Sequence, residues 1–316
     1  MSQPTRASKP SVSPQPETTA VLIPLSEAHA LITTFATFLT VGIHNILFYR
    51  NLYPATTFLS ARAYNLPVHQ NRHPKVCSWI QDAVEAVAAQ LANGNVEKVA
   101  VVVHAPLRFR SRDFNNKTGD GDNKGKADKA RAIDLPPGSV LEKWMFDVSR
   151  FPSWPGGAEA MREYGNAIRK REEDDDDEAA PAAEEEEEEP LSGDDRGIVA
   201  GDDAPKINWT DVEEQFRAVL RRLSHAAEGL EALPIGCTFT VAVELKEEGQ
   251  APIGHPQPWI PSQPNLQKTK NSTGGEVAGA KTTPIRSVEA GPLFFECWVE
   301  EGKAKNALKK TSSTFE

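Results

Sequence analysis

The sequence predicts an α+β fold with one long buried helix at its centre. The segment 25–53 has apolar residues at helical spacing around most of its circumference and contains no Pro or Gly-Gly break. Two shorter segments, 74–93 and 210–227, carry an apolar stripe on one side, which is typical of helices that cover a sheet. Four segments have the valine-rich composition or the apolar-polar alternation of strands: 96–104, 141–151, 237–245 and 293–300.

The central helix is expected to be a core helix and not a membrane span. It contains no window of about 18 uninterrupted apolar residues, which a membrane span requires. Ser26 is the expected N-cap, and Pro54 marks the end of the helix. A narrow polar face is left by Thr33, Thr37, Thr40 and His44.

The remaining elements are predicted from their boundaries as well as from their spacing. Pro74 lies in the first turn of the second helix, and Gly94 lies just past its end. The third helix opens with a capping box at residues 210–213. Segment 96–104 is apolar on both faces, so we expect it to be a central strand. Segment 56–74 is too broken for a helix, and we interpret it as a strand or a hairpin.

Polar and low-complexity stretches divide the chain into one domain and its appendages. A single core of about 200 ordered residues is expected. The domain is predicted to cover 23–302, with a disordered tail at 1–22 and a second tail at 303–316. Two polar stretches inside it, 105–138 and 152–205, are predicted to be flexible insertions.

Charge and cysteine content limit the classes of function. The formal charge is −10, but residues 172–189 contain thirteen acids and no bases, so the rest of the chain carries +3. This nearly neutral body has no dense Lys/Arg stripe, so strong direct binding to nucleic acid is not expected. Cys77, Cys237 and Cys297 are odd in number and far apart, which predicts buried free thiols and neither disulfides nor a zinc site. With no secretory signal in the sequence, a cytosolic or nuclear protein is expected.

Catalytic and cofactor motifs are not found in the sequence. There is no serine-hydrolase elbow, no zinc-protease motif and no cysteine with a plausible histidine partner nearby. A calcium loop starting at Asp120 fails because Lys124 and Arg131 stand where oxygen ligands are needed. His69 and His73 are four residues apart, but the prolines around them prevent a shared helical face. We therefore predict no catalytic residues, no metal and no cofactor.

Six segments, taken in order, resemble the HORMA-domain family, and within it the accessory subunits of translesion DNA polymerase zeta. The similarity covers about 170 to 200 residues, as expected for one domain of that size. The matching segments are HNILFYRNLYP (44–54), AYNLPVHQNRHP (63–74), SWIQDAVEAV (78–87), VEKVAVVV (96–103), IGCTFTVAV (235–243) and WVEE (298–301).

The resemblance implies a particular architecture and function. HORMA domains have a mainly antiparallel sheet with three helices on one face and a C-terminal safety belt, which here corresponds to about 247–300. The belt closes around an extended partner peptide, and its last strands dock on the sheet. The implied function is a non-catalytic nuclear adaptor of polymerase zeta. It would clamp a Pro-containing peptide of the catalytic subunit and bridge to the C-terminal domain of a scaffold translesion polymerase.

The resemblance also assigns candidate binding residues. Tyr64 and Trp259 match the aromatic positions that hold the proline-bearing motif, although core packing is an alternative for Tyr64. Glu296, Trp298 and the preceding proline segment with Pro284 match the scaffold-polymerase surface. Period-2 alternation places Glu296 and Trp298 on the face opposite the core residues of their strand.

A HORMA-to-HORMA dimer and other functions remain open at this point. Arg217 matches a dimer-contact arginine, and an ordinary solvated arginine is the alternative. Within the family, the alternative function is an adaptor of the spindle checkpoint or the meiotic chromosome axis. Outside the family, the alternative is an enzyme or a direct DNA-binding module.

Overall fold

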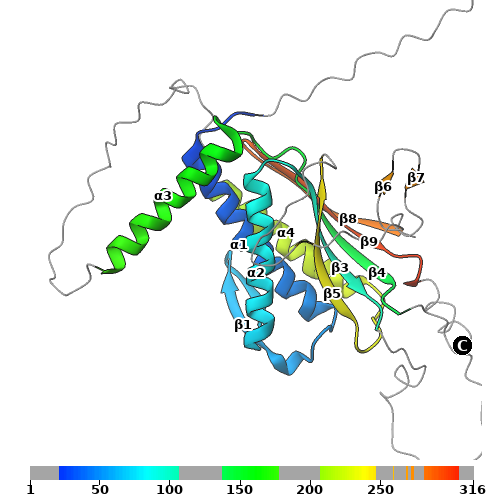
Figure 1. The fold of residues 1–316 in the computed structure, drawn as a ribbon. Helices are drawn as coiled ribbons and strands as arrows, with labels where there is room; N and C mark the ends of the chain where they lie inside the picture. The colour runs from blue at the N-terminus through cyan, green and yellow to red at the C-terminus, as the bar shows by residue number, and fades with distance from the viewer. Residues whose placement is uncertain are drawn as a thin grey trace, which may run out of the picture.

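The computed structural model describes residues 21–106, 137–177, 207–246, 259, 268, 269, 272, 273 and 281–305. In this part of the chain the predicted α+β architecture is confirmed. One five-stranded sheet, in which every pairing is antiparallel, has the strand order β5-β3-β4-β9-β8. Helices pack on one side of this sheet (Figure 1).

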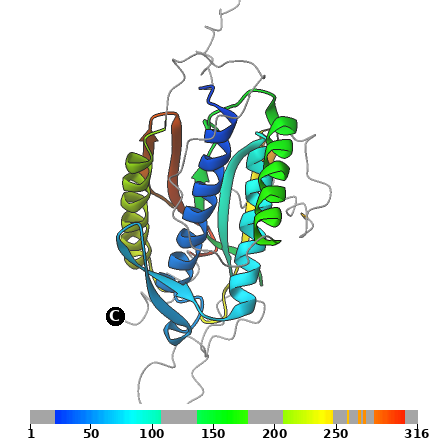
Figure 2. The same ribbon diagram turned by 90° about the vertical axis from the view of Figure 1, so that its left-hand side faces the viewer.

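Helix α1 (Leu25–Tyr49) forms the centre of the core, as predicted. Figure 2 shows it between α4 (Trp209–Gly229) and α2 (Pro74–Ala92). By length and composition α1 could cross a membrane, but most of its apolar stretch is buried inside the protein. Helix α1 ends at Tyr49, four residues before the predicted end at 53, because the chain turns at Asn51, which has a φ of 52°.

The predicted polar features of the helix ends need correction. The N-cap of α1 is Pro24, and Ser26 makes no capping hydrogen bond. His44 is buried and not part of an exposed polar face, and its Nδ1 accepts a hydrogen bond from the backbone N–H of Asn71 at 3.3 Å. Burial lowers the pKa of His44 to about 4. The third predicted helix is capped by the Asn208 side chain, two residues before the expected capping box.

The sheet is built from the predicted strands and one that was missed. Strands β3 (Val96–His104) and β4 (Val140–Asp147) are central, and β5 (Thr238–Leu245) forms one edge. At the other end, β9 (Leu293–Glu301) pairs with β4, and the unpredicted strand β8 (Lys281–Ala290) forms the edge. The short segment 56–74 begins in a 3₁₀ turn (Ala55–Thr57) and continues as the hairpin of β1 (Phe58–Ala63) and β2 (Leu66–Asn71). A separate small ladder pairs β6 (Lys268–Thr269) with β7 (Ser272–Thr273).

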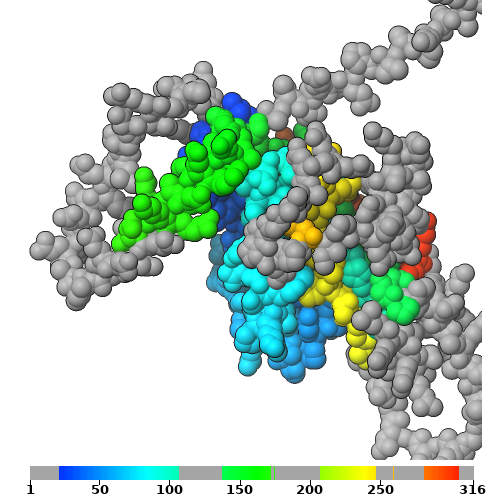
Figure 3. Space-filling model, in the orientation of Figure 1, coloured from blue at the N-terminus to red at the C-terminus, as the bar shows by residue number. Residues whose placement is uncertain are grey.

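A fourth helix lies inside the stretch predicted to be a flexible insertion. Helix α3 (Gly157–Asp177) begins next to the core and extends away from the body of the molecule (Figure 3). Its base is anchored by Trp154 and Met161, which are both buried, and by an edge contact between the rings of Tyr164 and His29 at 5.5 Å. The insertion 152–205 is therefore structured over its first part, and the expected count of three helices is too low.

Three further predicted boundaries change by a few residues. Leu22 forms a parallel bridge with Ser153, so the first tail is shorter than 1–22. Ala105 is fully buried, and its carbonyl accepts from Gly138 N–H, so the predicted insertion 105–138 includes residues of the fold at both ends. Residues 303–305 also belong to the fold, because Lys305 is buried. The rest of the predicted tails and insertions lies outside the described residues.

The order of the strands determines where the chain must run. Strand β5 forms one edge of the sheet, and the β8–β9 hairpin lies at the opposite edge. The chain between Lys246 and Lys281 therefore connects the two edges.

Substitution of Met161 tests whether α3 is part of the folded domain. Met161→Ala should lower the free energy of unfolding by about 2–5 kcal/mol, because truncation of this buried side chain leaves a cavity between α3 and the core. Arg162→Ala, at an exposed neighbouring position, should change it by less than about 0.5 kcal/mol. Urea unfolding of both variants measures the difference, and equal stability would show that the helix does not contribute to the fold.

Candidate functional site

Strand β5 has an unpaired edge among the described strands. It pairs with β3 on one side only, from Thr238 to Leu245. An edge strand presents backbone N–H and C=O groups that an extended peptide can pair with. The chain leaves the described part of the fold directly after this strand, at Lys246.

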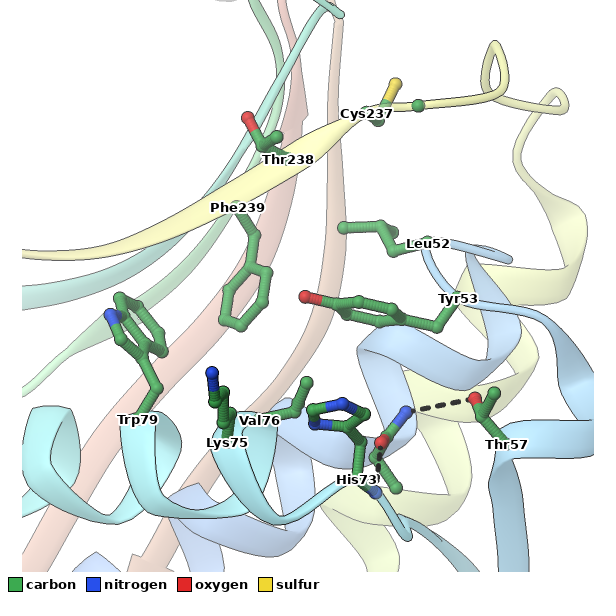
Figure 4. A pocket seen from close by; sticks show the side chains of 12 residues that line it. Leu52, Tyr53, Thr57, His73, Lys75, Val76, Trp79, Cys237, Thr238 and Phe239 are labelled. Atoms are coloured by element: carbon green, nitrogen blue, oxygen red, sulfur yellow. Dashed lines mark hydrogen bonds between the residues drawn. The ribbon is translucent and has the colours of Figure 1, made fainter.

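A cavity of about 680 Å³ opens beside the start of β5, between this strand and the N-terminus of α2. Figure 4 shows that Tyr53, Trp79 and Phe239 face one another across it. The Trp79 and Phe239 rings meet edge to face at 4.8 Å, and Tyr53 lies 6.5 Å from Phe239. Leu52 and Val76 complete the apolar wall. This lining suits a bulky apolar side chain.

Polar groups at the rim of the cavity are held in place by the β2–α2 connection. Asn71 donates from Nδ2 to Thr57 Oγ1 at 3.1 Å and accepts from the His73 backbone N–H at 2.9 Å. Lys75 and Thr238 also line the cavity. The cavity was not predicted, because its walls come from three segments far apart in the chain.

Tyr64 lies in the two-residue turn between β1 and β2. Both turn residues have positive φ angles, 51° for Tyr64 and 57° for Asn65, as a tight hairpin turn requires. The Tyr64 ring is half-buried, 6.0 Å from the Phe216 ring on α4. Burial, and to a smaller extent the charge of Glu213, raises the pKa of the Tyr64 phenol to about 12. The ring thus makes a core contact and keeps an accessible part.

Trp259 is half-buried and packs against the same main core. Its Nε1 is buried without a hydrogen-bond acceptor among the described residues. A buried donor of this kind is costly unless something accepts from it. No ring contact joins Trp259 to Tyr64 in the described part of the chain.

The predicted residues of β8 and β9 come together on the sheet face away from the helices. Pro284 is the register partner of Trp298, and both Pro284 and Glu296 are exposed. Trp298 packs on a small apolar cluster that includes Met145, and its Nε1 donates to Glu300 Oε1 at 2.9 Å. The predicted alternation is confirmed, because the intervening side chains are buried: Leu293, Phe295, Cys297 and Val299.

Arg217 lies on the exposed face of α4. Its side chain is 41% exposed and lies 3.4 Å from the carboxylate of Glu214, one turn earlier. Such an exposed pair contributes little to stability, so the guanidinium is available to a partner.

The three cysteine thiols are free, and two of them are buried. Burial raises the pKa of Cys237 and of Cys297 to about 12, so both are expected to be unreactive. Cys77 is only half-buried, which corrects the expectation for that residue, and it donates to the Asn71 carbonyl at 2.9 Å. Among the described residues, no cluster of three His, Cys, Asp or Glu side chains could hold a metal ion.

Comparisons with known proteins find sequence relatives that align with most of the chain. No protein-family model matches the chain. The chain is 35% identical over 279 residues to the mitotic spindle assembly checkpoint protein MAD2B of Bos taurus, covering 85% of this chain and 90% of the relative. It is 25% identical over 270 residues to the DNA polymerase zeta processivity subunit of Schizosaccharomyces pombe, covering 85% and 92%. A chain in the crystal structure of a mitotic checkpoint complex aligns with a TM-score of 0.49 and 16% identity, covering 87% and 96%.

The raised pKa of Tyr64 predicts how its phenol affects stability at high pH. The folded state holds the phenol proton more tightly than the unfolded chain. The protonated phenol therefore contributes to the free energy of unfolding below about pH 10, and this contribution is lost as the pH rises toward 12. Tyr64→Phe should therefore lose less stability than the unmodified protein between pH 9.5 and 11, a range about the usual tyrosine pKa. Urea unfolding across this range, with Tyr164→Phe as control, measures the effect. An identical pH slope for Tyr64→Phe and the unmodified protein would contradict it.

Proposed function

Because the chain belongs to the MAD2B family of HORMA-domain proteins, we propose that it is a non-catalytic adaptor subunit of DNA polymerase zeta in translesion synthesis. The observation that supports this most directly is the strand order. The segment that corresponds to the safety belt begins at one edge of the sheet and ends in a hairpin at the other. A chain that crosses the molecule in this way can enclose an extended peptide.

In this proposal, the clamped peptide belongs to the catalytic subunit. It pairs with the free edge of β5 and places a bulky apolar side chain in the cavity beside Trp79 and Phe239. Tyr64 and Trp259 hold its prolines, since flat aromatic faces suit rigid apolar rings and little entropy is lost. A peptide carbonyl that accepts from Trp259 Nε1 would satisfy this buried donor.

A second surface serves the scaffold translesion polymerase. Pro284, Glu296 and Trp298 form one patch on the outward face of the β8–β9 hairpin, with Phe294 held at its end by the guanidinium of Arg150 at 3.8 Å. The patch combines an exposed proline, a half-buried aromatic ring and a carboxylate. An aromatic ring next to polar groups is typical of a protein interface, with the ring as the expected anchor and the carboxylate at the rim. The protein would thus bridge two polymerases in the nucleus.

A spindle-checkpoint or meiotic-axis adaptor is the alternative function. The first is favoured by the name of the Bos taurus relative, a mitotic spindle assembly checkpoint protein. The two functions differ in the peptide that is clamped, so binding to a checkpoint activator's peptide in preference to the polymerase peptide would favour the alternative.

Trp259→Ala tests the clamp. The substitution should weaken binding of the Pro-containing peptide of the catalytic subunit by roughly 30-fold to 1000-fold, as expected for an aromatic hot spot. Trp298→Ala should leave peptide affinity nearly unchanged and should weaken binding of the scaffold polymerase's C-terminal domain instead. Calorimetric titration against both partners measures these effects, with Trp209→Ala, an exposed tryptophan on α4, as the control.

The two-surface proposal fails under either of two results. One is that Trp259→Ala binds the catalytic-subunit peptide as tightly as the unmodified protein. The other is that Trp298→Ala loses this peptide and keeps the scaffold domain. Melting temperatures of the three variants separate loss of binding from loss of fold.

Arg217→Ala tests the proposed HORMA-to-HORMA dimer. If the guanidinium contacts a second HORMA domain, the variant should associate more weakly, by about tenfold for a loss of 1.4 kcal/mol, with unchanged peptide binding. Arg221→Ala, one turn further along the exposed face of α4, is the matched control. Sedimentation at several concentrations gives the result, and an unchanged monomer-dimer balance would make Arg217 an ordinary surface charge.

A further inference from the structure

The residues that follow β9 fold back onto the first residues of β4. Gly302 donates from its backbone N–H to the Leu141 carbonyl at 2.7 Å, and Lys305 N–H donates to the Gly302 carbonyl at 3.0 Å. Gly302 lies so close to β4 that a Cβ atom on it would stand 2.2 Å from the Val140 carbonyl oxygen. This contact therefore requires glycine, and it brings the side chain of Lys305 into the protein.

Lys305 completes a buried cluster of charges. Its Nζ lies 2.6 Å from Glu142 Oε1 and 2.9 Å from Glu301 Oε2. Arg50, at the end of α1, contacts both oxygens of the same Glu142 carboxylate at 2.7 and 2.9 Å. The exposed fractions are 1% for Lys305, 0% for Glu142, 3% for Glu301 and 4% for Arg50.

The cluster joins four elements of the fold. Arg50 also donates to the carbonyls of Ala227 and Leu230, at the end of α4. Glu142 lies on β4, and Glu301 is the last residue of β9. The two buried cations balance the two buried anions, so removal of Lys305 leaves two buried carboxylates with one buried cation, Arg50, which contacts only Glu142 of the two. Lys281 cannot replace it, because its side chain is 64% exposed and its Nζ lies 3.6 Å from Glu301.

We propose that residues 301–305 act as a latch that holds the β8–β9 hairpin on the edge of β4. The hairpin is joined to the rest of the sheet through the β4–β9 pairing, whose last register pair is Glu142 with Glu301. Lys305 bonds to both carboxylates of this pair. Breaking a buried ion pair by removing one partner leaves an uncompensated charge, so the end of this ladder opens when Lys305 is lost.

The latch also regulates partner release, a step that rests on the proposed function. The chain leaves the described fold at the end of β5 and re-enters it at the β8–β9 hairpin, so an enclosed peptide would leave only when one of these two elements lets go. Of these, β5 continues from the folded body, whereas the hairpin is held at its far end by the latch. Opening of the latch therefore precedes release.

Hydrogen exchange on the full-length protein tests the latch without any partner. Lys305→Met removes the charge and keeps most of the side chain, and Gly302→Ala displaces the segment without changing any charge. In both variants, amides of the β4–β9 ladder should exchange about tenfold faster or more, while those of the β3–β5 ladder keep their rates. Lys170→Met, an exposed lysine on α3, is the matched control and should leave both ladders unchanged.

A charge-balancing variant keeps the test decisive if Lys305→Met is poorly folded. Lys305→Met combined with Glu301→Gln removes one cation and one anion, and it should recover much of the lost β4–β9 protection. The latch proposal is overturned if amide exchange becomes faster to the same extent in the β4–β9 and β3–β5 ladders of Lys305→Met and Gly302→Ala, because the two residues would then act only on global stability. It is also overturned if the exchange rates of neither ladder change.

The regulatory step has its own readout. The probe is the labelled Pro-containing peptide of the catalytic subunit, and its dissociation rate should rise about tenfold in Lys305→Met and stay unchanged in Lys170→Met. Faster exchange with an unchanged dissociation rate would overturn the regulatory step. Failure of the unmodified protein to bind the peptide would instead contradict the proposed function, while the exchange result would still decide whether the latch exists.

Discussion

The main core depends on one strand near the end of the chain. Phe295 of β9 packs against Phe35, Phe38 and Phe216 with ring centroids 5.4, 5.8 and 6.0 Å apart. Around it, Leu293, Cys297 and Val299 are buried in the same cluster. Without the β8–β9 hairpin, the apolar faces of α1 and α4 would lack part of the sheet surface on which they pack. The hairpin is therefore an integral part of the domain.

This dependence sets the energy scale for any movement of the hairpin. Three large apolar side chains of β9 are fully buried, and at about 1.5–3 kcal/mol each their exposure would cost about 5–9 kcal/mol. That range is comparable to the total stability of a typical domain, about 5–15 kcal/mol. The hairpin can leave β4 only if another part of the chain or a partner covers the same surface. A fold with two strand arrangements meets this condition, because one arrangement replaces the other.

Periodicity in the sequence was sufficient for most of the fold and for part of the site. The helical spacing of α1 and α2 and the alternation of β5 and β9 gave the correct elements, and the outward direction of Trp298 followed from that alternation. Helix α3 was missed because its polar sequence buries little beyond Met161, and β8 was missed because Pro284 interrupts a Thr-rich stretch. The cavity near Phe239 and the buried Lys305 depend on contacts between distant segments, which no local pattern encodes.

The two proposed partner surfaces lie at opposite edges of one sheet, yet they are coupled by the chain itself. Strands β3 and β4 separate β5 from β9, so a peptide on β5 leaves Trp298 uncovered and both partners can bind together. The segment proposed to enclose the peptide leads into β8, which contributes Pro284 to the second proposed surface. A partner bound across Pro284 and Trp298 therefore holds the hairpin in place and slows release of the peptide. To the extent that this raises the equilibrium affinity for the peptide, thermodynamic reciprocity requires the enclosed peptide to strengthen binding of the second partner by the same factor.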